Sequence, residues 1–168
     1  MAEEKQTEAK WQRKATVKLN GLTPDQVWPL VSDFCALDKW VASLDTCRHV
    51  DGVPGQLGLV RYCASTAQPT SNGGDGPTII WAKEKLVAID PIGRSLSYEV
   101  IDNNMGIKSY VGTMKVLATD GSDAGGGCQI EWSFVADPIQ GWSLEDFAAY
   151  INSALQSMGK RMEEALRS

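Results

Sequence analysis

The stretch TIIWAKEKLVAID, residues 78–90, alternates apolar and charged side chains in the manner of a half-buried β-strand. Successive side chains of a strand point to opposite faces of the sheet. The two lysines, Lys83 and Lys85, therefore share a face that we expect to meet water. The opposite face carries Ile80, Ala82, Glu84 and Leu86, so one carboxylate points toward the protein interior among apolar side chains.

The preceding predicted strand, residues 56–64, carries an arginine that could partner this carboxylate. The same alternation places Leu57, Leu59, Arg61 and Cys63 on the inner face. The two strands flank the Gly-rich loop 66–78, whose middle is the turn-forming dipeptide Asn72-Gly73. If the hairpin is centred on this dipeptide, Arg61 and Glu84 face each other on the inner side of the sheet.

A buried pair of Arg61 and Glu84 has two interpretations. In the first it is a structural ion pair that ties two strands together, although such pairs are often no better than apolar packing. In the second it belongs to a ligand site, where Glu84 moves a proton and Arg61 holds a ligand oxygen. The residues alone leave both interpretations open.

The segments that precede these strands predict one strand and two short helices. Alternation over residues 11–19 predicts a first strand that ends at the Asn20-Gly21 turn. Thr23 followed by Pro24 is typical of a helix start, and we expect this helix to run to Phe34 with a kink at Pro29. A second short helix is expected over residues 36–41, and further strands over residues 46–51, 94–102, 106–118 and 127–137.

A long amphipathic helix closes the chain. Ser143 is a plausible N-cap, and apolar residues follow at helical spacing: Leu144, Phe147, Ile151, Leu155, Met158, Met162 and Leu166. We expect this stripe to cover the concave face of the sheet. The predicted fold class is α+β, a curved antiparallel β-sheet wrapped around a long C-terminal helix with an internal cavity. Residues 10–168 are expected to form this single domain, after a disordered N-terminus over residues 1–9.

Composition excludes several classes of function. The net charge of −5 and the sequence pI of about 4.9 argue against a nucleic-acid partner and against binding to anionic membranes. No apolar run has the length of about 20 residues that a membrane-spanning helix needs, so we expect no membrane insertion. The polar start MAEEKQTEAK does not resemble a secretory signal. We therefore expect a cytoplasmic protein.

The cysteines and the histidine do not predict a metal site. Cys35, Cys47, Cys63 and Cys128 lack the spacing of a zinc or thioredoxin motif, and His49 is the only histidine. We expect the cysteines to be reduced and to pack in the core. No metal and no cofactor is expected.

Five segments, VWPLVSDF, LGLVRY, WAKEKLVAID, SYVGTM and EWSF, resemble in this order the plant lachrymatory factor synthase family. That family lies in the superfamily of birch-pollen allergens, abscisic acid receptors, polyketide cyclases and START domains. The resemblance covers residues 11–166 and implies the helix-grip fold. It also implies a cofactor-free isomerase that rearranges a short alkenyl sulfenic acid into a thial S-oxide. In this reaction the residue matching Arg61 holds the oxygen and the residue matching Glu84 relays the proton.

The resemblance further implies a substrate-binding pocket that is lined by Tyr98, Tyr110, Trp132, Ile80 and Leu155. From the residues alone, the three aromatics are equally typical of core packing, although buried tyrosine hydroxyls need partners. Two departures predict a reshaped or enlarged pocket: Ile80 replaces a family aromatic, and a tryptophan of the final helix is replaced near Ala154. The loop between Arg61 and Glu84 is also longer than in the family.

Two functions remain open at this point. The first is an isomerase, or as a variant a lyase of the cyanohydrin type, acting on a small polarised molecule. The second is a carrier or receptor for a small hydrophobic plant metabolite, with loop 66–78 as a lid. An abscisic acid receptor is disfavoured, because NNMGIK stands where its His-rich latch is expected, and Asp45 stands near the position where its ligand-binding lysine is expected. The expected partner is a small hydrophobic or sulfur-containing metabolite, and the expected assembly is a monomer or weak dimer.

Overall fold

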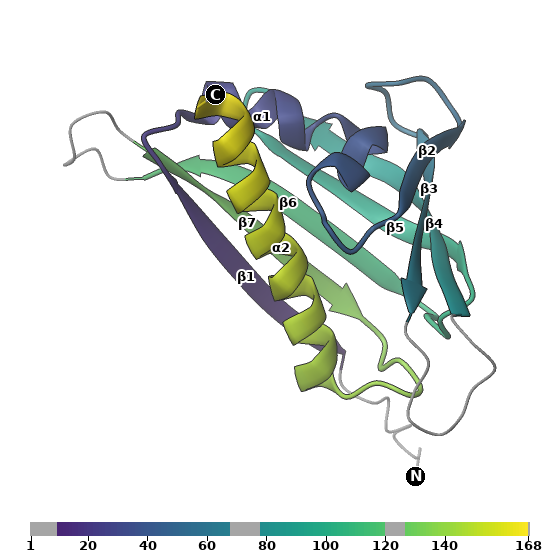
Figure 1. Ribbon diagram of the computed structural model, residues 1–168. Helices are drawn as coiled ribbons and strands as arrows, with labels where there is room; N and C mark the ends of the chain where they lie inside the picture. Colours follow the sequence, from purple (N-terminus) through teal and green to yellow (C-terminus); the bar gives the residue numbers. More distant parts are fainter. Residues whose placement is uncertain (1–9, 68–77, 120–126, 168) are drawn as a thin grey trace, which may run out of the picture.

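The computed structural model describes residues 10–67, 78–119 and 127–167 (Figure 1). The element order is β1 (Trp11–Asn20), α1 (Pro24–Val31), the 3-10 helix η1 (Phe34–Lys39), β2 (Thr46–Asp51), β3 (Val60–Ala67), β4 (Thr78–Asp90), β5 (Ser95–Asn103), β6 (Tyr110–Ala118), β7 (Gly127–Ala136) and α2 (Leu144–Arg167). The predicted disorder of residues 1–9 and the predicted lid within loop 66–78 lie outside the described residues, apart from the ends of β3 and β4.

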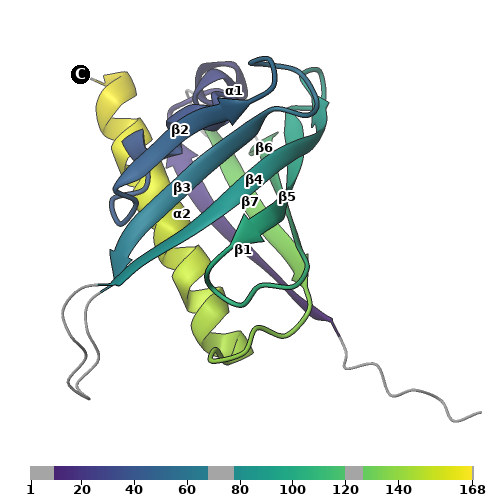
Figure 2. The same ribbon diagram turned by 90° about the vertical axis from the view of Figure 1, so that its right-hand side faces the viewer.

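The strands form a seven-stranded sheet in the order β1-β7-β6-β5-β4-β3-β2, with every neighbouring pair antiparallel. Because β1 pairs with the last strand, the chain must cross from one edge of the sheet to the other before β2, and α1 and η1 make this crossing. α2 runs along the concave side of the curved sheet (Figures 1 and 2). This architecture is the α+β helix-grip arrangement that the sequence predicts.

Local hydrogen bonds explain where the helices begin. Thr23 forms a capping box with Gln26: the Gln26 amide donates to Thr23 Oγ1 at 3.2 Å, and the Thr23 amide donates to Gln26 Oε1 at 2.9 Å. The Ser143 hydroxyl accepts from the Asp146 amide at 3.0 Å, which confirms the predicted cap of α2. α1 ends at Val31 rather than at Phe34, because the α-helical conformation stops there and the 3-10 helix η1 begins at Phe34.

Two strands are shorter at their start than the sequence predicts. β3 begins at Val60 instead of residue 56, and Leu57 is 59% exposed rather than on the inner face. The segment before β3 folds back so that the backbones of Gly52 and Gly58 lie close together. A Cβ added to Gly52 would lie only 2.7 Å from the Gly58 carbonyl oxygen. Gly52 and Gly58 also have positive φ, which fits turns and not an extended strand.

β6 begins at Tyr110 instead of residue 106, because the Asn103 side chain organises a turn before it. Its Oδ1 accepts from the Met105 and Ile107 amides at 2.8 and 3.0 Å, and its Nδ2 donates to the Ile107 carbonyl at 2.9 Å. These backbone groups are therefore satisfied by a side chain and not by a neighbouring strand.

The core lies between α2 and the concave face of the sheet. The predicted apolar stripe of α2 is buried at Phe147, Ile151, Leu155, Met158 and Met162. α2 approaches β1 closely at Gly159, where a Cβ would lie 2.7 Å from Val17 Cγ2. A cavity remains between the N-terminal half of α2 and the inner faces of β3 to β7. The candidate site lies in this cavity.

Candidate functional site

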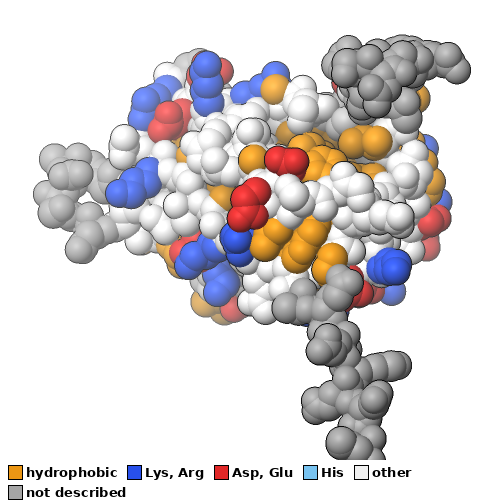
Figure 3. Space-filling view, turned by 90° about the horizontal axis from the view of Figure 1, so that it is seen from below, with side chains coloured by type: hydrophobic (Ala, Val, Ile, Leu, Met, Phe, Trp, Pro, Cys, Tyr) orange, Lys and Arg blue, Asp and Glu red, His pale blue; other side chains and the backbone are white. Residues whose placement is uncertain are grey.

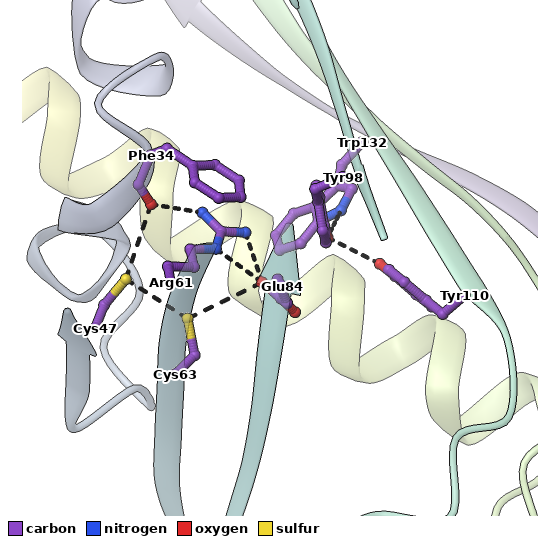
Figure 4. Close-up of polar contacts among 8 residues, drawn as sticks. All are labelled: Phe34, Cys47, Arg61, Cys63, Glu84, Tyr98, Tyr110 and Trp132. Carbon is purple, nitrogen blue, oxygen red and sulfur yellow. Dashed lines mark hydrogen bonds and ion pairs between the residues drawn. The ribbon is translucent and has the colours of Figure 1, made fainter. Parts of the chain in front are cut away.

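Arg61 and Glu84 are directly paired across β3 and β4, as the hairpin centre at Asn72-Gly73 predicts. The Arg61 Nε donates to Glu84 Oε1 at 2.8 Å, and Nη2 lies 2.7 Å from the same oxygen (Figure 4). The Arg61 side chain is 4% exposed and that of Glu84 is 14% exposed. The pair is therefore a largely buried ion pair.

Arg61 is held on its other sides by η1 and β5. Its Nη1 donates to the Phe34 carbonyl oxygen at 2.8 Å. The guanidinium carbon also lies 3.9 Å from the centre of the Phe34 ring and 4.9 Å from that of Tyr98. Burial by itself would lower the pKa of Arg61, but the adjacent Glu84 charge raises it above the ordinary value. The guanidinium is thus a fixed, charged group.

Glu84 is bound through one of its two carboxylate oxygens. Both contacts with Arg61 end on Oε1, and the Cys63 thiol lies 4.0 Å from the same atom. In Figure 4 the other oxygen, Oε2, is turned away from Arg61. Oε1 thus holds the arginine, and Oε2 takes no part in this ion pair.

A second polar cluster connects three aromatic side chains of the inner face. The Trp132 Nε1 donates to Tyr98 Oη at 3.0 Å, and Tyr98 Oη lies 3.0 Å from Tyr110 Oη (Figure 4). Burial raises the pKa of both tyrosines well above the ordinary value, so both hydroxyls are protonated at neutral pH. Tyr98 Oη accepts the hydrogen bond from the Trp132 N–H, and either hydroxyl can be the donor in the bond between Tyr98 and Tyr110.

Gly112 makes room for this cluster. It pairs with Tyr98 across β5 and β6, and a Cβ at this position would lie 2.5 Å from Tyr98 Cζ. A glycine is therefore required for steric reasons beside the tyrosine ring.

Both clusters line one cavity of about 90 Å³. Its walls are mostly apolar and include Leu37, Val41, Leu44, Ile80, Val100, Met105, Ile107, Phe147 and Ile151. A space of this size holds several water molecules or a small organic molecule. Hydrophobic side chains gather in the middle of the molecular face where α2 begins, next to acidic side chains (Figure 3).

The structure brings together six of the seven predicted site residues. Arg61, Glu84, Tyr98, Tyr110, Trp132 and Ile80 line the cavity. Leu155 does not line it: its side chain is fully buried in the core, and the preceding residue Ala154 faces the cavity instead. Each residue turns a helix by about 100°, so neighbouring positions of α2 point in different directions.

Sequence reasoning missed Tyr150, which lines the cavity from the first turns of α2. Burial raises the pKa of its hydroxyl, and the nearby Glu84 carboxylate raises it further. Tyr150 lies four residues before Ala154 and thus on the same face of the helix, which is a signal that could have identified it. It adds a hydroxyl to the apolar wall on the α2 side.

The described residues contain neither a metal-binding cluster nor a membrane-spanning helix. Residues 10–67, 78–119 and 127–167 contain no cluster of three or more His, Cys, Asp or Glu side chains that could hold a metal ion. Across the same residues, no helix combines the length and the hydropathy that crossing a membrane would require.

The fold and the cavity define a class of protein, in which a curved antiparallel sheet and a long helix enclose a small-molecule site. The chain belongs to the family described as polyketide cyclase / dehydrase and lipid transport, whose model matches residues 10–167. The membership agrees with a hydrophobic cavity that takes small ligands.

Solved structures of similar proteins have the same fold. The protein XoxI from Bacillus cereus is 21% identical, with a TM-score of 0.68 over 92% of this chain and 94% of that chain. The major latex-like protein 151 from Panax ginseng is 19% identical, with a TM-score of 0.64 over 92% of this chain and 97% of that chain. An uncharacterised protein from Bacillus thuringiensis is 18% identical, with a TM-score of 0.66 over 90% of this chain and 98% of that chain. At these identities the likeness shows the fold alone.

Proposed function

We propose that this protein is a cofactor-free isomerase that moves a proton within a small polarised molecule, with a short alkenyl sulfenic acid as its substrate class. The observation that carries this proposal is the bonding of Glu84: Oε1 holds Arg61, while Oε2 is turned away from it in the wall of the cavity. The resemblance of the segments around both residues to the lachrymatory factor synthase family supports the same activity.

Arg61 would bind the substrate oxygen. Glu84 and Phe34 each engage the guanidinium, and one N–H remains on each of its two terminal nitrogens. Because the guanidinium is held by hydrogen bonds and by two aromatic rings, it needs no rearrangement to receive an oxygen. The apolar walls would strengthen its attraction for a developing negative charge.

Glu84 would relay the proton. Oε2 would take the proton from the S–O–H group of the sulfenic acid and return a proton to the alkenyl carbon, which yields the thial S-oxide without change in overall formula. The substrate oxygen gains negative charge during this step, and the Arg61 guanidinium would stabilise it. Tyr110 could donate a further hydrogen bond from the opposite side of the cavity.

The test is a coupled assay in which a cysteine sulfoxide lyase generates the alkenyl sulfenic acid in the presence of the protein. We expect the wild type to form thial S-oxide and Glu84→Gln to lose about 10²–10⁴-fold of the rate, the usual contribution of a positioned acid or base. Glu99→Gln is the matched control. Glu99 also lies on the sheet, but it follows the inward-pointing Tyr98 and therefore points to the outer face. A Glu84→Gln variant with wild-type rate would contradict the role of Glu84, and no product from the folded wild type would contradict the substrate class.

The second candidate is a binding protein for a small hydrophobic metabolite, which the mostly apolar walls and the lipid-transport part of the family description favour. In that case Arg61 and Glu84 would orient a ligand, and no chemistry would follow. Mass spectrometry of small molecules extracted from the purified protein tests this candidate. It is supported if one metabolite is retained by the wild type and by Glu99→Gln but lost from Arg61→Met, with no turnover of that metabolite.

A further inference from the structure

Two cysteines face each other beside the Arg61–Glu84 pair. Cys47 on β2 and Cys63 on β3 are direct cross-strand partners, and their sulfur atoms are 3.5 Å apart (Figure 4). Both are free thiols. The cross-strand register is favourable for a covalent link, because directly opposed residues of antiparallel strands have Cα atoms about 4.5–5.5 Å apart, within the usual range for disulfides.

The two thiols have different environments. Cys63 is buried and donates its S–H to Cys47, whereas Cys47 is half-buried on the edge strand of the sheet. The hydrogen bond from Cys63 lowers the pKa of Cys47, burial opposes this, and the Arg61 charge lowers it further. The same hydrogen bond and burial raise the pKa of Cys63 well above the ordinary value. The thiolate, which is the reactive form of cysteine, therefore forms more readily at Cys47 than at Cys63.

We propose that Cys47 and Cys63 form a redox site that is oxidised to a disulfide by hydroperoxides. The Cys47 thiolate attacks one oxygen of the hydroperoxide and breaks the O–O bond, giving Cys47 sulfenic acid and releasing the other oxygen as water or an alcohol after protonation. The Cys63 sulfur then attacks the Cys47 sulfur, the S–O bond breaks, and the hydroxyl leaves as water with the Cys63 proton. Two thiols are oxidised and one hydroperoxide is reduced.

The oxidation would alter the candidate site. Bond formation brings the two sulfur atoms from 3.5 Å to about 2.05 Å, so Cys63 moves toward β2. Cys63 lines the cavity and its sulfur lies 4.0 Å from Glu84 Oε1, so this contact would lengthen. The disulfide would thus link the redox state of the protein to the environment of Glu84.

The remaining cysteines serve as internal controls. Cys128 lies on β7, is buried, and burial raises its pKa to about 11, so it should be the slowest to react. Cys35 lies in η1, and burial raises its pKa as well. Trypsin places each cysteine in a separate peptide, namely 19–39, 40–48, 62–83 and 116–160, so every possible linkage is distinguishable by mass.

The experiment treats the reduced full-length protein with hydrogen peroxide and maps its peptides under non-reducing conditions. We expect peptides 40–48 and 62–83 to be joined with a loss of two hydrogens, and the link to disappear on reduction. In Cys63→Ser, Cys47 should instead accumulate as sulfenic acid, trapped with dimedone, whereas Cys128→Ser should form the disulfide as the wild type does.

Three results would overturn the proposal. The first is that Cys47 and Cys63 both stay reduced at a peroxide dose that oxidises free cysteine. The second is a dominant link of Cys47 to Cys35. The third is a Cys63→Ser protein with no more dimedone adduct on Cys47 than on Cys128. The wild-type peptide map alone decides the first two, so the proposal does not depend on the folding of a variant.

Discussion

Arg61 and Glu84 lie opposite each other on β3 and β4, and both of their contacts use the same carboxylate oxygen, Glu84 Oε1. The geometry is unsymmetrical, since a bidentate pair would engage both oxygens. Phe34 and Tyr98 hold the arginine in place, and Oε2 of Glu84 is not used by the ion pair. In the proposed reaction, the ion pair and the proton transfer would use different oxygens of Glu84, so variants can separate the two roles.

Removal of Arg61 alone should destabilise the protein strongly. In Arg61→Met the Glu84 carboxylate loses its partner in a largely apolar cavity, and breaking such a buried pair costs about 3–5 kcal/mol. Glu84 is 14% exposed, so we expect a loss near the lower end of this range. The double variant Arg61→Met/Glu84→Leu should recover most of this loss. Urea unfolding measures both values, and a double variant no more stable than Arg61→Met would contradict the argument.

Tyr98 should contribute more to stability than Tyr110. Tyr98→Phe leaves the Trp132 N–H without its acceptor and Tyr110 without its partner, which should cost about 1–3 kcal/mol. Tyr110→Phe should cost less, because Tyr98 keeps the bond from Trp132. The free energies of unfolding of the two variants test this order, and equal losses would contradict it.

Gly112→Ala should disturb the Tyr98 cluster. The new Cβ would lie 2.5 Å from Tyr98 Cζ, so the ring must shift, and overpacking of this kind costs about 1–3 kcal/mol. The shift should also change the fluorescence of Trp132, whose N–H is bonded to Tyr98. The neighbouring variant Val111→Ala, at an exposed position, is the control and should stay within about 0.5 kcal/mol of wild type. Unfolding and fluorescence of Gly112→Ala that match this control would refute the steric argument.

Cys47 should be alkylated at lower pH than Cys128. A lowered pKa means that the thiolate forms at lower pH, and the thiolate is the species that reacts with iodoacetamide. Cys128, whose pKa burial raises to about 11, should react appreciably only at strongly alkaline pH. Rates of alkylation of peptides 40–48 and 116–160 between neutral and alkaline pH measure the difference. Superimposable pH profiles for the two peptides would argue against it.

Several elements of this protein could be predicted because their signals are local. Alternation along residues 78–90 assigned Glu84 to the inner face, and the turn dipeptide Asn72-Gly73 was sufficient to align it with Arg61. The helical spacing of apolar residues after Ser143 identified α2 and its buried face. In each case the period of the backbone determines which side chains share a face, so no knowledge of distant residues is needed.

Other features were decided by tertiary structure. Leu57 alternates correctly with its neighbours, yet the turn that Gly52 makes against the backbone of Gly58 keeps it out of β3. Asn103 replaces the predicted start of β6 with a turn through three side-chain hydrogen bonds. Such interactions compete locally with strand pairing. The alternation of apolar and polar residues along the sequence does not reveal them.

The sequence by itself determined that Arg61 and Glu84 point inward and that they lie opposite each other. Only the tertiary structure decided that the Phe34 carbonyl oxygen accepts a hydrogen bond from Arg61. It also decided that Ala154 rather than Leu155 faces the cavity and that Tyr150 lines it. The reason is physical: periodicity and hairpin register act along the chain or between adjacent strands. The position of η1 and the rotation of α2, by contrast, result from packing against a sheet whose curvature depends on all of its strands.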